Sequence, residues 1–131
     1  KKWKGIEKEY DEDTEKLIFE CEYNNGERNG KGKEYDKYNG ELLFSGTYLN
    51  GKRNGQGEEY KLIPFGRSSN GSNYYSSRDN SKNIIIFSGE YLNGERKEGS
   101  EYNYDEKLVY KGGFLNGKKM EKGHYIIIWK I

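Results

Sequence analysis

Four copies of one phrase constrain this chain more than any other feature of its sequence. Residues 17–35 (LIFECEYNNGERNGKGKEY), 42–60 (LLFSGTYLNGKRNGQGEEY) and 85–102 (IIFSGEYLNGERKEGSEY) are nearly the same, and residues 108–126 form a looser fourth copy. The aromatic residues that open the copies lie 25, 43 and 23 residues apart, so the middle step holds an insertion of roughly 20 residues. Repetition at this period predicts small stacked units, each contacting only its neighbours.

Each copy has the pattern of a β-hairpin. Apolar and polar residues alternate in the front half, as in a half-buried strand. An Asn-Gly pair follows, and it is a strong hairpin signal because both residues tolerate positive φ. A more polar return strand comes next. The predicted fold is therefore all-β: a single-layer, twisted antiparallel sheet of consecutive β-hairpin repeats. The alternation predicts one face that carries, in the second copy, Leu42, Phe44, Gly46 and Tyr48.

A small residue lies between the two aromatic positions of each front strand. Gly46, Gly89 and Gly112 leave room for neighbouring rings to pack over bare backbone. Cys21 takes this position in the first copy. Because it is small and apolar, we interpret it as a packed thiol rather than a reactive one.

The repeat divides the chain into units of one predicted domain, residues 1–131. The segment GIEKEY, residues 5–10, matches GKGKEY, residues 30–35, so a half repeat opens the chain. The predicted units are a half repeat at 3–16, repeats at 17–41, 42–60, 84–107 and 108–126, an inserted loop at 61–83 and an apolar strand at 125–131.

Composition excludes several classes of protein. Hydrophobic residues make up 31% and charged residues 34% of the chain, which predicts a thin fold without a deep core, and the thirteen tyrosines supply further apolar area. A net charge of +1 argues against nucleic-acid binding, which needs clustered basic surface. One cysteine and one histidine leave no disulfide framework and little for metal or triad chemistry.

Location is only weakly indicated by the sequence. No signal peptide and no apolar run near 18 residues is seen. The first residue is Lys, so we expect the chain to begin inside a longer protein or after removed residues. An intracellular location, cytoplasmic or associated with the cytoskeleton, is favoured.

The residues that could carry catalysis have simpler structural interpretations. His124 aligns with polar positions of the other return strands. Residues 11–15 (DEDTE) lack the Gly and Glu of a calcium loop and read as an acidic turn. Glu58 and Glu59 are adjacent on a strand, so they point to opposite faces. The sequence therefore predicts no enzyme and no cofactor.

Three surfaces are candidates for partner binding. An aromatic face could form a groove for a peptide, although the same rings could instead form the core between repeats. A basic row at the turns could contact anions, although acidic neighbours such as Glu27, Glu95 and Glu121 favour a solvated edge. The apolar terminal strand could pair with a partner or another copy, or pack back as a cap. The predicted residues are Tyr23, Phe44, Tyr48, Phe87, Tyr91 and Phe114 on the face, Arg28, Arg53, Arg96 and Lys119 in the row, and Ile126, Ile128 and Trp129 in the terminal strand.

Residues 44–60 resemble a MORN repeat. The pattern is an aromatic residue, any residue, Gly, any residue and an aromatic residue, then Asn-Gly-Lys-Arg-x-Gly-x-Gly. The step of 23 residues equals the family's period, and the resemblance covers residues 3–60 and 84–126. Two positions depart from it: Gly99 arrives one residue early, and Glu121 stands where Gly55 stands in the second copy.

The resemblance implies a single-layer sheet of stacked hairpins, usually non-catalytic, that serves as a scaffold, a dimerisation rod or a peptide-binding groove. We therefore expect a non-enzymatic interaction scaffold or assembly rod whose partner is another protein or a second copy of itself. Two alternatives stay open. One is a tether to anionic, phosphoinositide-containing membrane through the basic row. The other is an inhibitor of a partner protein, of the antitoxin or immunity type.

Overall fold

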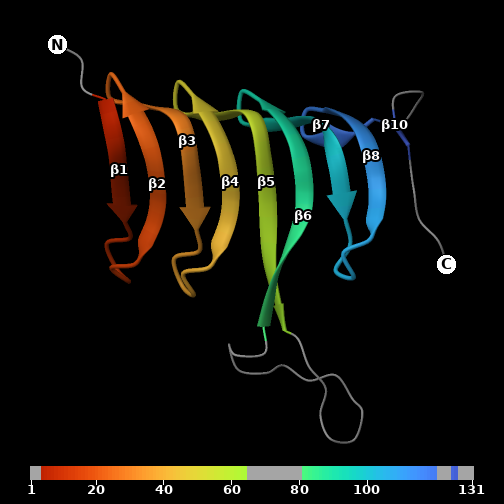
Figure 1. Ribbon diagram of the computed structural model, residues 1–131, viewed down its shortest axis with the longest axis horizontal. Coiled ribbons are helices and arrows are strands. Elements are labelled where there is room, and N and C mark those ends of the chain that lie inside the picture. Colours follow the sequence, from red (N-terminus) through yellow and green to blue (C-terminus); the bar gives the residue numbers. More distant parts are fainter. Residues whose placement is uncertain (1–3, 65–80, 121–124, 127–131) are drawn as a thin grey trace, which may run out of the picture.

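The computed structural model describes residues 4–64, 81–120 and 125–126, and these form one open antiparallel sheet without a helix. The strands run side by side in chain order from one end of the sheet to the other (Figure 1). This confirms the predicted all-β architecture of stacked hairpins. The strands are β1 (Lys4–Tyr10), β2 (Leu17–Asn24), β3 (Glu27–Tyr35), β4 (Leu42–Leu49), β5 (Lys52–Pro64), β6 (Ser81–Leu92), β7 (Glu95–Tyr102), β8 (Leu108–Leu115), β9 (Lys118–Lys119) and β10 (Tyr125–Ile126).

The Asn-Gly pairs form the hairpin turns, as the sequence predicts. Both residues have positive φ in the pairs at 25–26, 50–51, 93–94 and 116–117; Asn50 has φ 50° and Gly51 has φ 87°. These turns lie along the upper edge in Figure 1. Two of these turns are also hydrogen-bonded to the preceding hairpin. The N–H of Gly51 donates to the carbonyl of Arg28, and the N–H of Gly94 donates to the carbonyl of Arg53.

The turns that join one hairpin to the next lie along the opposite edge and are organised by a short polar side chain (Figure 1). The carboxylate of Asp36 accepts bonds from the N–H groups of Tyr38 and Asn39. Asp11 does the same for Asp13 and Thr14, so residues 11–15 form the turn that was predicted. An oxygen that bonds the backbone two or three residues ahead is the usual way in which Asp and Asn start a turn.

A β-bulge recurs where each return strand meets the next front strand. Glu34 pairs with Phe44, but its neighbour Tyr35 pairs with Leu42. The same shift occurs at Tyr10–Leu17, Tyr60–Ile85 and Tyr102–Leu108. The prediction that Leu42 simply continues the aromatic face is therefore wrong, because the extra residue of the bulge places Leu42 opposite Tyr35 instead.

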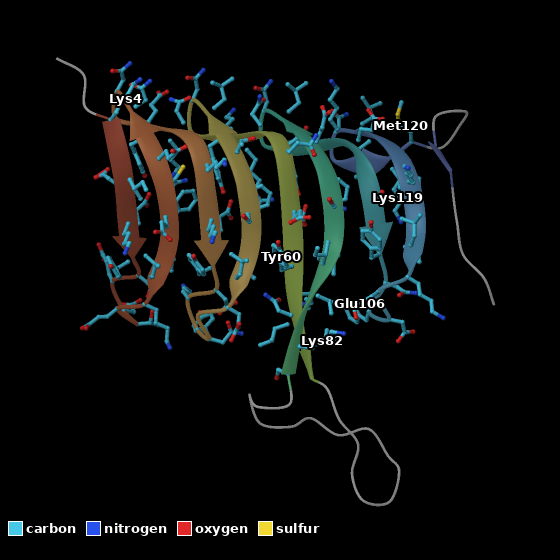
Figure 2. The ribbon with its side chains drawn as sticks, in the orientation of Figure 1. Lys4, Tyr60, Lys82, Glu106, Lys119 and Met120 are labelled. Carbon is cyan, nitrogen blue, oxygen red and sulfur yellow. The ribbon has the colours of Figure 1, made fainter. Side chains whose placement is uncertain are left out.

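The predicted loop at 61–83 is shorter than expected. Strand β5 continues to Pro64 and β6 begins at Ser81, so four further residue pairs extend this hairpin beyond the edge of the sheet (Figure 1). Lys82 of this extension forms an ion pair with Glu106, 2.6 Å long, in the β7–β8 turn (Figure 2). The sequence alone did not reveal these strand ends because the other repeats have no counterpart for them.

The far edge of the sheet is partly covered by the chain itself. Strand β10 pairs antiparallel with β8, with Tyr125 opposite Gly112 and Ile126 opposite Lys111. The described part of the predicted terminal strand therefore packs against its own sheet. His124, Ile128 and Trp129 lie outside the described residues.

Candidate functional site

One face of the sheet, here called the ring face, carries a continuous ladder of aromatic side chains. Consecutive rings meet edge to face with centroids 5.1 to 5.8 Å apart. Phe44, Phe87 and Phe19 each contact an aromatic ring of the following hairpin, so the ladder links every hairpin to the next. Edge-to-face pairs contribute about 0.5–1.5 kcal/mol each beyond the area they bury. In order, the rings are Phe19, Tyr48, Phe44, Tyr91, Phe87, Phe114 and Tyr110.

Glycine makes this packing possible. A Cβ added at Gly57 would lie 2.6 Å from the ring of Phe44 and 3.0 Å from that of Tyr91. At Gly46 and Gly89 the added atom would also meet backbone atoms of the next strand. The predicted role of glycine as space for neighbouring rings is therefore confirmed at Gly46 and Gly89.

A polar layer covers the rings. In the second hairpin the guanidinium of Arg53 lies 3.9 Å above the ring of Phe44 and bonds Glu34 with two N–H groups, at 2.9 and 3.0 Å. The hydroxyl of Tyr48 donates to the same carboxylate. Arg53 is on β5 and Glu34 on β3, so the cation spans the intervening strand β4 and ties one hairpin to the preceding one. We call this arrangement an arginine lock.

The lock recurs in each hairpin. Arg28 stacks on Phe19 and binds Glu9. Arg96 stacks on Phe87 and binds both Glu59 and Glu101. The last copy is altered: Lys119 pairs with Glu101, at 2.6 Å, above Tyr110, and Phe114 stands where the other hairpins have a tyrosine hydroxyl. The final lock therefore lacks the guanidinium and the tyrosine hydroxyl that bind the carboxylate in the others.

The predicted aromatic face is brought together, but it is largely closed. Five of its six residues are no more than 7% exposed, and Tyr23 is half-buried. Rings this covered offer a partner almost no surface. These side chains form a core between repeats, which is the second of the two interpretations that the sequence allows. The five are Phe44, Tyr48, Phe87, Tyr91 and Phe114.

The predicted basic row is also brought together, with different partners from those expected. Arg28, Arg53 and Arg96 bind carboxylates of the preceding return strands rather than the turn residues Glu27 and Glu95. Each guanidinium is thus already neutralised and stacked. The signal for this was present in the sequence, since a Glu-Tyr pair recurs in β1, β3, β5 and β7, and its glutamates are Glu9, Glu34, Glu59 and Glu101.

The locks make the folded protein sensitive to acid. Burial alone would raise the pKa of the Glu34 carboxyl. However, hydrogen bonds from Arg53 and Tyr48, together with the charge of Arg53, outweigh burial and lower this pKa from its ordinary value of 4.5. The pKa of Glu59 is lowered in the same way by Arg96 and Tyr91. A carboxyl group whose pKa is lowered on folding stabilises the folded state at pH values above its pKa in the unfolded chain. This stabilisation is lost as the pH falls through its pKa in the folded protein.

We therefore expect the melting temperature to be level near neutral pH and to fall steadily below about pH 4.5. Differential scanning calorimetry between pH 7 and pH 3 measures this. Glu34→Gln should have a lower melting temperature at pH 7 and a flatter acid limb. An acid limb as steep in the variant as in the wild type would show that Glu34 does not carry the effect.

Cys21 is packed in the aromatic core, opposite Gly32. Burial raises the pKa of its thiol to about 11, and the negative charges of Glu22 and Glu9 act in the same direction while Arg28 opposes them. Since the thiolate is the reactive form, we expect a disulfide reagent such as dithionitrobenzoate to label Cys21 only after denaturation. Rapid labelling of the native protein would contradict the interpretation of Cys21 as a packed thiol.

The opposite surface, here called the second face, is more open. Each return strand turns a tyrosine toward it, next to the Glu that serves a lock on the ring face. Each tyrosine pairs across the bulge with an aliphatic residue. These eight side chains form a band across the sheet that we call the tyrosine stripe, and Figure 2 labels its member Tyr60. The stripe comprises Tyr10, Leu17, Tyr35, Leu42, Tyr60, Ile85, Tyr102 and Leu108; Tyr10 is exposed and the rest are half-buried.

Charged and small polar side chains lie beside the stripe. Lys33 pairs with Ser45, and Ser45 with Glu58. Tyr60 donates its hydroxyl to Glu58 at 2.8 Å, which places both on the second face. Over β1 to β4 this face is hollowed by a shallow cavity of about 480 Å³, lined in part by Glu20, Lys33 and Thr47. The stripe is not evident from the sequence, because the bulge that creates it is a feature of strand register.

A sheet of stacked β-hairpins with one face closed by repeating locks and the other face open defines a repeat protein of the solenoid type. A comparison with protein-family sequence profiles places it further: the MORN repeat matches residues 20–37, 44–61 and 110–127. These three segments of the chain are therefore MORN repeats by their sequence. MORN repeats are a non-enzymatic repeat type, generally found in scaffolds that interact with proteins or membranes.

Neither the search of curated proteins nor the search of solved structures gave a match. None of the described residues belongs to a helix long and apolar enough to cross a membrane.

Proposed function

We propose that this protein is a non-enzymatic scaffold that binds another protein through the second face of its sheet. The observation that carries the proposal is the contrast between the two faces. The aromatic and basic side chains of the ring face contact one another within the chain, whereas the side chains of the tyrosine stripe stay partly exposed on the second face. Apolar surface that a folded chain leaves open in one band is typical of a partner site.

The same contrast makes the membrane alternative weaker. A lipid tether needs cations that are free to meet phosphate groups. The three guanidinium groups of the predicted row are held by carboxylates and stacked on rings. Using them for lipid would require the locks to open, which would expose the rings beneath.

We propose separately that the terminal strand contacts a partner or a second copy of the protein. The backbone of Ile126 is paired with β8, and contacts of Ile126, Ile128 and Trp129 with a partner stay predictions. Deletion of residues 127–131 followed by light scattering tests for self-association through them. An unchanged mass would remove this part of the proposal.

Affinity capture with matched variants tests the role of the second face. Tagged wild type, a stripe variant (Tyr35→Ser with Leu42→Ser) and an edge control (Leu49→Ser with Leu92→Ser) are incubated with an extract of cells that express the protein. Leu49 and Leu92 are each 51% exposed and lie next to the Asn-Gly turns, so the control removes apolar surface elsewhere. Bound proteins are quantified by mass spectrometry.

We expect a stoichiometric partner that the edge control retains and the stripe variant loses, with both variants folded by circular dichroism. The same partners on all three proteins would contradict the proposal. Binding to vesicles that contain phosphatidylserine and phosphatidylinositol bisphosphate, weakened by salt and by Arg53→Gln, would favour the membrane alternative instead.

A further inference from the structure

The spacing of the tyrosine stripe indicates the kind of chain that it fits. Its four tyrosines lie on β1, β3, β5 and β7, which are alternate strands. Neighbouring strands lie about 4.8 Å apart, so successive tyrosines repeat at roughly 9.6 Å across the sheet. A ligand that crosses the strands must present a side chain to the stripe at that interval.

A polyproline II helix meets this requirement best. It rises about 3.1 Å per residue with three residues per turn, so every third residue returns to one side after roughly 9.3 Å. An extended β-strand has a period of two, so its same-face residues recur at roughly 6.6 or 13.2 Å. In an α-helix, residues seven positions apart lie on the same side and are roughly 10.5 Å apart. This interval is longer than the tyrosine spacing, so the side chains of a helix would fall out of step with the tyrosines after a few repeats.

The charges beside the stripe give the ligand a direction. Glu90 lies directly opposite Glu98 across β6 and β7 on the second face, and like charges in such a pair repel. Neither carboxylate has an ion pair within the described part of the chain. Glu58 lies diagonally beside Glu90. Over β5 to β7 the second face is therefore acidic, whereas over β2 and β3 it carries Glu20 and Glu22 beside Lys31 and Lys33, so its charges are mixed there.

We propose that the tyrosine stripe binds a proline-rich protein segment in polyproline II conformation, laid across the strands, with basic residues at the end that lies over β5 to β7. A proline at every third position packs between successive tyrosines, and the preformed conformation lowers the entropy lost on binding. The inference rests on the proposed function, because it names the partner class of the same surface.

Three labelled peptides of equal length test the inference by fluorescence anisotropy. The first has four prolines, one at every third position, and two arginines at one end. The second has glycine in place of each proline, and the third is an amphipathic helix of the same net charge. We expect the first to bind at least tenfold more tightly than the other two.

Matched variants locate the site. Tyr35→Ala with Tyr60→Ala should weaken binding of the proline peptide about tenfold, whereas the edge control defined above, Leu49→Ser with Leu92→Ser, should leave it unchanged. Because loss of two tyrosines can perturb folding, Glu90→Lys with Glu98→Lys provides a second test. That variant exchanges one like-charged pair for another of opposite sign, and it should weaken binding of the arginine peptide severalfold while leaving binding of a version with glutamine for arginine unchanged.

Equal binding of the proline and glycine peptides would overturn the inference, as would binding of none of the three. Tighter binding of the helical peptide, lost in the Tyr35→Ala/Tyr60→Ala variant, would overturn the proline assignment and leave the second face as the interaction surface. The capture experiment uses no designed peptide, so failure of the proposed function is measured independently.

Discussion

Replacement of Gly89 by alanine is expected to destabilise the protein by about 3 kcal/mol. A Cβ at this position would lie 2.2 Å from the carbonyl oxygen of Glu98 and 2.6 Å from the Cα of Gly99. Both are backbone atoms of the paired strand β7, so no side-chain rotation can relieve the contact. Strands β6 and β7 would have to separate where the ring of Phe87 packs over Gly89 and Gly99. Thermal unfolding followed by circular dichroism measures the effect, as a fall in melting temperature of roughly 10 °C.

Gly51→Ala is the matched control. Gly51 has φ 87° and no neighbour within 4 Å of an added Cβ, so it tests the cost of positive φ without a clash. That cost is about 1 kcal/mol. If the two substitutions were equally destabilising, glycine would be needed in this fold for its backbone conformation alone, and the packing argument would be wrong.

Removal of one partner of an arginine lock is the second large effect. Arg53→Met should cost about 2–3 kcal/mol, because Glu34 then keeps a half-buried charge without its cation and the ring of Phe44 loses its cover. About a quarter of each side chain is exposed, which places the expected cost below that of a fully buried pair. Chemical denaturation of the single variants and of the double variant with Glu34→Gln gives the coupling energy.

The exposed pair of Lys82 and Glu106 is the comparison for this cycle. Its side chains are about half exposed, and such a pair contributes about 0.2–1 kcal/mol. We expect a clearly larger coupling for Arg53 and Glu34. Equal couplings in the two cycles would mean that the lock is a surface ion pair and does not hold the hairpins together.

Much of the fold could be predicted from local sequence. Asn-Gly pairs specify hairpin turns because few other residues accept positive φ in succession. The alternation around Phe44 and Tyr48 identified a half-buried strand, and the glycine between them identified the space for neighbouring rings. These signals are local, so each repeat carries them independently.

The use of the two faces could not be predicted in the same way. The lock joins Arg53 to a residue two strands away, and only the register of β3, β4 and β5 shows that Glu34 lies within its reach. The ring face is closed because the guanidinium of each lock covers the aromatic ring beneath it. Without the lock this ring would be exposed to solvent. The stripe depends on the bulge at Tyr35, which shifts the pairing by one residue and has no clear sequence signature.

Hydroxyl-radical footprinting of the native protein, read by mass spectrometry at each tyrosine, tests most directly the claim that the ring face is closed and the second face open. The account predicts fast oxidation of Tyr10, which is 57% exposed, measurable oxidation of Tyr35 and Tyr60, and strong protection of Tyr48 and Tyr91. Oxidation of Tyr48 and Tyr91 as fast as that of Tyr10 would show that the locks do not cover the rings and would contradict the account.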